Sequence, residues 1–242
     1  MLGATSQAEA RELADPDRHR PELARSLGNL GITYTELGRL ADALPPAEEV
    51  LLIRRELAAA DPDRWRPDLA SALENLGVTL VDLDRPAEAL PLAEEVLLIR
   101  RELAAAPDRW RPDLACALDN LGATLSELGR PAEGLELCRE ALEFSKDLTG
   151  TAKRHESGLA RSLSNVAAIL LRLGRAAEAL PFAEDAVAVN RGPAAAIPDR
   201  FRPDLAGRLG DLGTCTVGTE QTRSCAAGHC RGSRNLPGSR RS

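Results

Sequence analysis

Apolar residues recur along the chain at the spacing of an amphipathic helix. In the segment RPDLASALENLGVTLVDL, which begins at Arg66, the apolar stripe consists of Leu69, Leu73, Leu76, Leu80 and Leu83. Spacings of four and three residues keep such a stripe on one face of a helix. The following segment has a second stripe, formed by Leu90, Ala93, Val96, Leu97 and Leu103. The pattern predicts two helices that pack against each other.

Proline and glycine mark the expected ends of these helices. Pro67 suits the first helical position, and Asp68 places a negative charge in the first turn, where the helix dipole favours it. The sequence Leu128-Gly129-Arg130-Pro131 predicts that one helix ends at the glycine and the next begins at the proline. Three prolines lie early in the second helices, where each predicts a bend rather than a break: Pro45, Pro91 and Pro181.

The two-helix segment recurs as an internal repeat. PDRHRPELARSLGNLG, PDRWRPDLASALENLG, PDRWRPDLACALDNLG and PDRFRPDLAGRLGDLG begin at positions 16, 62, 107 and 198, and a degenerate copy begins near 152. Residues 16–213 are therefore expected to form an all-α array of about four helix pairs and a truncated fifth. A ring recurs at the same place in each junction, where we expect it to pack between successive units: His19, Trp65, Trp110, His155 and Phe201.

These units resemble tetratricopeptide repeats, of the longer kind found in kinesin light chains. The resemblance rests on a large-then-small step in the first helix, at Leu30-Gly31, Leu76-Gly77, Leu121-Gly122 and Val166-Ala167. A small residue follows in each second helix, at Ala43, Ala89, Gly134 and Ala179. Small residues let the two backbones approach closely where paired helices cross.

One position departs from the family pattern. Where the family often has an aromatic residue in the second helix, this chain has Ala47, Ala93, Cys138 and Ala183. The departure predicts closer helix spacing or compensating leucines. The resemblance as a whole implies a right-handed superhelix of α-α pairs, a solenoid whose first helices line a concave groove.

In similar repeats the groove binds a peptide or a partner protein, and an asparagine before the Leu-Gly step contacts the bound peptide. Here that position holds Asn29, Asn75, Asn120 and Asn165. An amide side chain donates and accepts hydrogen bonds, so a ladder of amides suits an extended peptide backbone. The alternative is that each asparagine caps or bridges neighbouring helices without a ligand.

Charged residues project onto the same predicted face. They are Arg25, Glu74, Asp82, Asp119, Glu127, Arg161 and Arg172. The acidic middle and basic ends fit a partner with a basic centre, whereas solvated charges on helix faces are the ordinary alternative.

Composition narrows the class of protein further. The formal net charge of −6 disfavours a general nucleic-acid binder. No apolar run approaches the ~20 residues of a membrane span, and the N-terminus lacks signal-peptide features, so a cytoplasmic protein is expected. The resemblance to repeat arrays of bacterial proteins implies a bacterial protein. We find no phosphate loop, catalytic triad or common metal-ligand spacing, and Cys225, His229 and Cys230 match no zinc pattern. We therefore expect no enzyme activity, metal or cofactor.

The two ends differ from the array. Residues 1–15 resemble the end of a preceding second helix. Residues 214–242 have no helical period and carry five Arg against one Glu, so we expect disorder there. A shifted reading frame over residues 229–242 would restore a repeat-like second helix, which the nucleotide sequence tests. Such a frameshift would leave the apolar stripe from Leu205 to Leu212 exposed, which is a route to a homodimer.

These features predict a scaffold that binds a protein or peptide of unknown identity in its groove. The alternative is a self-associating structural fragment of a larger bacterial signalling or nucleotide-hydrolysing protein, without a ligand of its own. Because a fold does not assign a function, the binding hypothesis is an analogy.

Overall fold

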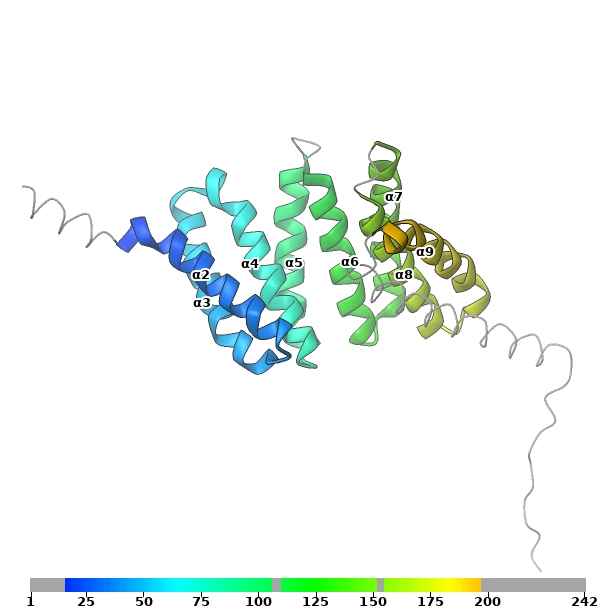
Figure 1. Ribbon diagram of the computed structural model, residues 1–242, viewed down its shortest axis with the longest axis horizontal. Coiled ribbons are helices and arrows are strands. Elements are labelled where there is room, and N and C mark those ends of the chain that lie inside the picture. Colours follow the sequence, from blue (N-terminus) through cyan, green and yellow to red (C-terminus); the bar gives the residue numbers. More distant parts are fainter. Residues whose placement is uncertain (1–15, 106–109, 152–154, 197–242) are drawn as a thin grey trace, which may run out of the picture. The chain divides into compact units, whose positions relative to one another are not determined.

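The computed structural model describes residues 16–105, 110–151 and 155–196, and this part of the chain contains eight α-helices and no strand (Figure 1). The helices follow one another as four pairs, as the repeat predicts. They are α2 (Pro16–Glu36) and α3 (Leu40–Ala60), α4 (Pro62–Asp82) and α5 (Pro86–Ala104), α6 (Arg111–Glu127) and α7 (Pro131–Thr151), and α8 (Glu156–Arg172) and α9 (Ala176–Ala196). The predicted fifth unit, near residue 198, and both predicted end segments lie outside the described residues.

The described residues fall into two compact units that divide after Gly158, so α2 to α7 form the first unit and α9 with most of α8 forms the second. In the first unit each helix packs against the next along the chain, and α4 also contacts α6. The predicted leucine stripe of α4 faces this interior, since Leu69, Leu73, Leu76 and Leu80 are all buried. In the second unit Val166, Ala167 and Ala179 are fully buried, so its large-then-small step also faces a core.

The first helices of the early pairs begin earlier than the sequence indicated. Pro67 was expected at the start of a helix, but α4 begins at Pro62 and Pro67 lies inside it. The cause is an N-cap, because the side chain of Asp61 accepts a hydrogen bond from the backbone N–H of Arg64 at 3.3 Å. The third pair lacks the equivalent aspartate in its sequence, and α6 begins at Arg111 with Pro112 in its first turn, as predicted.

The second helices run through their internal prolines without a break, as predicted. Pro45 and Pro46 lie within α3, Pro91 lies within α5, and Pro181 lies within the bounds of α9. At the junction between α3 and α4, the half-buried ring of Trp65 packs against the core of the first unit and lies 5.3 Å from the guanidinium of Arg54. This ring therefore has the predicted packing role.

Each helix pair turns through one residue with a positive φ. The residue is Gly38, Gly129 and Gly174 in three pairs, with φ between 70° and 78°, but in the second pair it is Asp84 with φ 59°. The following N–H, that of Arg85, donates to the Leu80 carbonyl at 2.8 Å and closes the end of α4. Arg85 then pairs with Glu88 in the first turn of α5, which lowers the pKa of Glu88.

We expect Asp84→Gly to raise the free energy of unfolding by about 0.5–1 kcal/mol, because a residue with a Cβ is strained in the left-handed region. Gly129→Asp, at the equivalent turn, should lower it by a similar amount. Urea denaturation of both variants checks this pair, and a loss of stability in Asp84→Gly would contradict it.

The pairs differ in how closely their helices cross. A Cβ placed on Gly122 would lie 2.5 Å from the Cys138 sulfur and 2.8 Å from the Gly134 carbonyl oxygen. A Cβ on the equivalent Gly77 of the second pair would meet nothing within 4 Å, and one on Gly31 would meet only a carbonyl at 3.9 Å. The predicted close approach of backbones is therefore confirmed in the third pair, and in the first two pairs the helices are wider apart at this position.

The same substitution should consequently have opposite effects at the two sites. Gly122→Ala should cost about 1–3 kcal/mol of stability, because the new methyl group overpacks the crossing. Gly77→Ala should leave stability unchanged or raise it by up to about 1 kcal/mol, since alanine favours a helix and has open space here. Thermal denaturation followed by circular dichroism measures both, and equal effects would show that the crossings are alike.

Candidate functional site

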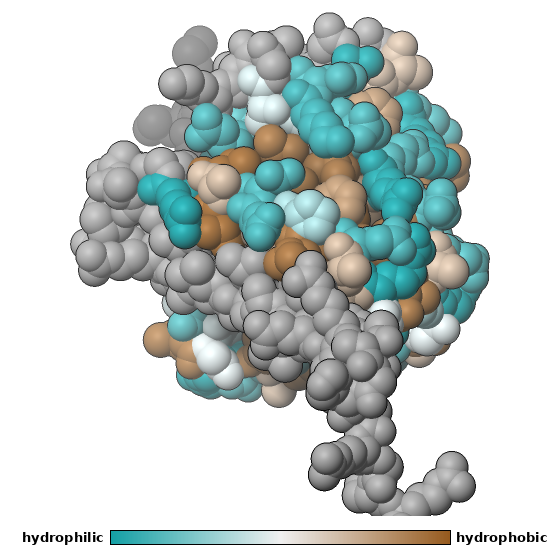
Figure 2. Space-filling model, turned by 90° about the vertical axis from the view of Figure 1, so that its right-hand side faces the viewer, coloured by the Kyte–Doolittle hydropathy of each residue, from teal (hydrophilic) through white to brown (hydrophobic). Residues whose placement is uncertain are grey.

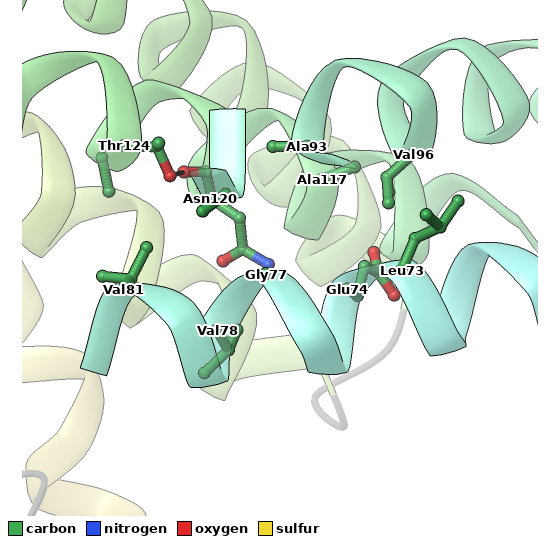
Figure 3. A pocket seen from close by; sticks show the side chains of 12 residues that line it. Leu73, Glu74, Gly77, Val78, Val81, Ala93, Val96, Ala117, Asn120 and Thr124 are labelled. Atoms are coloured by element: carbon green, nitrogen blue, oxygen red, sulfur yellow. Dashed lines mark hydrogen bonds between the residues drawn. The ribbon is translucent and has the colours of Figure 1, made fainter. Parts of the chain in front are cut away.

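Among the hollows on the first unit, two lie between successive first helices and over the second helix that joins them. One is lined by α2, α3 and α4. The other is lined by α4, α5 and α6 (Figure 3). We call them the first hollow and the second hollow.

The hollows are built from equivalent residues, one repeat apart. Gly31, Ile32, Ala43, Ala47 and Val50 line the first hollow at the positions that Gly77, Val78, Ala89, Ala93 and Val96 take in the second. From the next unit, Ala72, Asn75 and Thr79 correspond to Ala117, Asn120 and Thr124. The hollows are thus a repeated feature of the array.

The missing aromatic residue explains why the hollows exist. Ala47 and Ala93, where the family often has an aromatic side chain, lie in their linings. The sequence left open closer helix spacing or compensating leucines at this position. In the first two pairs, leucines pack against the buried cluster that includes Ala89: Leu44, Leu51 and Leu92. In the third pair the Cys138 sulfur would lie 2.5 Å from a Cβ on Gly122.

Two of the four predicted asparagines line the hollows, Asn75 the first and Asn120 the second. The Asn120 amide points from α6 toward Gly77 on α4 in Figure 3, and its nitrogen makes a hydrogen bond to the Cys116 sulfur at 3.8 Å. Asn75 is exposed. Their backbone carbonyls accept hydrogen bonds from Thr79 and Thr124, one turn later, each at 2.9 Å.

The other predicted site residues lie elsewhere. Asn29 and Arg25 are exposed on α2 but line neither hollow. Asn165 and Arg161 are half-buried on α8, in the second unit. Figure 2 shows one face of the molecule, on which hydrophilic and apolar side chains are interspersed.

Asp119 is wholly buried, so a ligand in the hollows does not reach it. It comes one residue before Asn120, and a helix turns about 100° per residue, which directs it toward α7 instead. The Cys138 thiol of α7 donates to its backbone carbonyl at 3.9 Å. Burial, together with the negative charge of Asp119, raises the pKa of the Cys138 thiol, so this cysteine stays protonated.

Glu74 lines the second hollow but is already engaged by a buried arginine that the sequence analysis did not identify. Arg100 on α5 is only 3% exposed, and its guanidinium lies 2.9 Å from Glu74, 3.5 Å from Asp113 and 3.1 Å from the Ser71 hydroxyl. The equivalent Arg54 pairs with Asp68 at 3.2 Å. Arginine at this second-helix position therefore links consecutive units.

Carboxylates stand at the C-terminal ends of the first helices. α2 ends at Glu36, α4 at Asp82 and α6 at Glu127, and none of the three helices has a basic residue in its last turn. Glu36 and Asp82 are exposed and line the first hollow. Arg172, at the same register, is exposed on α8 in the second unit.

Comparison with known proteins identifies the repeats. Two models of the tetratricopeptide repeat match, one over residues 113–192 and the other over residues 23–63 and 69–106. No curated protein matches the chain significantly.

Solved structures resemble the fold at low sequence identity. A Podosopora anserina chain with nearly identical TPR-like repeats of the kinesin light chain kind is 21% identical with a TM-score of 0.56, over 88% of this chain and 99% of its own. BtubC (BKLC) from P. vanneervenii is 22% identical with a TM-score of 0.57, over 99% of this chain and 92% of its own. The apo form of RapI is 13% identical with a TM-score of 0.58, over 95% of this chain and 90% of its own. At these identities the likeness shows the fold alone.

Within the described residues, no helix is both long enough and apolar enough to span a bilayer. In the same ranges no three His, Cys, Asp or Glu side chains gather as metal ligands would.

We expect Glu74→Gln to lower the free energy of unfolding by about 1.5–3 kcal/mol, because it weakens a charge-assisted hydrogen bond to buried Arg100. Glu88→Gln removes an exposed ion pair with Arg85 and should cost less than about 1 kcal/mol. Chemical denaturation of the two variants at neutral pH compares them, and equal losses would show that burial of Arg100 adds nothing.

Proposed function

The chain belongs to the tetratricopeptide repeat family, and from this premise we propose that it binds a peptide segment of a partner protein along its two hollows. A protein-binding scaffold is what repeats of this family support, and the family is generally not enzymatic. The use of the hollows is the finer part of the proposal. The observation that carries it is that both hollows are lined by equivalent residues of consecutive repeats.

The chemistry of the hollows fits an extended peptide. Alanine and valine side chains line most of each hollow, so an apolar side chain that enters it leaves water. Asn75 and Asn120 each add one amide at equivalent places in the two linings. An amide can donate to a peptide carbonyl and accept from a peptide N–H, whatever the peptide sequence.

Self-association is the second candidate. The homodimer predicted through the fifth unit depends on residues outside the described part of the chain. Within the described part, α2 exposes large apolar side chains, among them Leu23 and Leu30, and Leu37 just after its end is exposed too. Light scattering separates the candidates, because a monodisperse monomer at high concentration would count against self-association.

Filling the hollows should abolish peptide binding. We would select peptides from a random display library on the full chain and measure their affinities by fluorescence anisotropy. The double variant Ala47→Phe/Ala93→Phe places a ring where the family often has one, and we expect the selected peptides to bind it at least about tenfold more weakly.

The matched control is Leu52→Ala/Leu98→Ala, which alters two equivalent exposed side chains of α3 and α5 that line neither hollow. It should leave affinity unchanged. Should the phenylalanine variant lose its helical circular dichroism, Asn75→Ala/Asn120→Ala replaces it. Peptides that bind the wild type and the altered hollows equally well would overturn the proposal.

A further inference from the structure

We propose that the first hollow selects a peptide in which a lysine or arginine adjoins an apolar residue. The apolar side chain enters the hollow, and the cation lies at its rim beside Glu36 and Asp82. This inference rests on the proposed function and adds the chemistry of the partner.

The interior of the first hollow is suited to an apolar side chain. Its walls include Leu27, Ile32, Ala47, Val50 and Val78. Ile32 and Val78 are 54% and 47% exposed, so two large apolar side chains face solvent there. Covering them with a ligand side chain removes apolar surface from water, which favours binding.

The rim of the same hollow is negatively charged. Glu36 and Asp82 are the last residues of α2 and α4, and both line it. A helix carries a partial negative charge at its C-terminus, where a further carboxylate is unfavourable and a cation is favourable. Neither helix has a basic residue in its last turn, so the helix ends and the carboxylates add to one negative potential.

The nearest arginines in the sequence do not neutralise this rim. Arg39, which follows α2, pairs with Asp42 at 2.7 Å, and Arg85, which follows α4, pairs with Glu88 at 2.6 Å. Each thus pairs with a carboxylate in the first turn of the next helix. In the described ranges no ion pair to Glu36 or Asp82 is present. A cation from the ligand is the complement that the rim lacks.

The second hollow has a lining of equivalent residues, but no exposed carboxylate belongs to it. Its one acidic lining residue, Glu74, is held by Arg100 at 2.9 Å. Because the two hollows lie one repeat apart, this difference in charge favours one orientation of a peptide that spans both. The basic-apolar step of the peptide is specified at the α2–α4 hollow, and an uncharged segment suits the α4–α6 hollow.

The test uses three series of synthetic fluorescein-labelled peptides that share their apolar residues and carry lysine, glutamine or glutamate beside one of them. Affinity for the full chain is measured by anisotropy at low and high salt. We expect the lysine series to bind tightest and the glutamate series weakest, with the lysine preference weaker at high salt. In Glu36→Gln/Asp82→Asn the preference for lysine over glutamine should fall about five- to tenfold.

The matched control is Glu140→Gln/Glu143→Gln, which removes two carboxylates of α7 and changes net charge equally. Those carboxylates pair with Arg101 and Lys146 and line neither hollow, so the lysine preference should persist. A preference that disappears in both double variants would reflect net charge only and would overturn the inference.

The remaining outcomes distinguish a failure of the basic-apolar preference from a failure of peptide binding in the hollows. If all three series bind alike, and Ala47→Phe/Ala93→Phe abolishes their binding, the groove function stands and the basic-apolar preference is wrong. If no series binds, and library peptides bind equally well after the hollows are filled, both the groove function and the basic-apolar preference are wrong.

A peptide of residues 214–242, rich in arginine, is assayed alongside. Tighter binding of that peptide than of every other would make the chain itself the occupant and overturn the proposal of a separate partner.

Discussion

The residues at which paired helices cross control what the first unit presents to solvent. In the third pair two glycines face each other and the backbones nearly touch, so that no Cβ fits on Gly122. In the first two pairs alanine replaces the second glycine, and Ala43 and Ala89 belong to the linings of the hollows. Interiors pack at nearly constant density, so a helix pair that is kept apart without a large side chain between its members leaves space. The hollows follow from that wider crossing.

Much of this architecture was predictable from the sequence, because it depends on local signals repeated several times. Apolar stripes at a helical period, the turn at Gly129 and a constant repeat length predicted the helix pairs without reference to distant contacts. The start of α4 was misplaced for an equally local reason, since Asp61 acts as an N-cap and carries the helix back through a segment that looks like a turn.

The site was harder to predict because its residues depend on contacts between units. Asn75 and Asn120 could be identified from their position before the Leu-Gly step, and both line a hollow. Asp119 could not be excluded by the same reasoning, because a one-residue difference in helix phase separates a solvent-facing side chain from a buried one. Arg100 stands next to Arg101 in the sequence, and only its contacts with Glu74 and Asp113 show that it links two repeats.

Because each hollow takes residues from two consecutive units, the second unit contributes to both hollows. Val78 belongs to both linings, and α4 supplies one wall to each. Duplication of a unit therefore adds a site at a new junction, and the chemistry of that site depends on which copies meet there. The first two copies are nearly identical over long stretches, yet the two hollows differ in charge, since the rim carboxylates of one are exposed and the acidic residue of the other is held by Arg100. The difference between the two hollows therefore lies in which carboxylates line them and in how those carboxylates are paired.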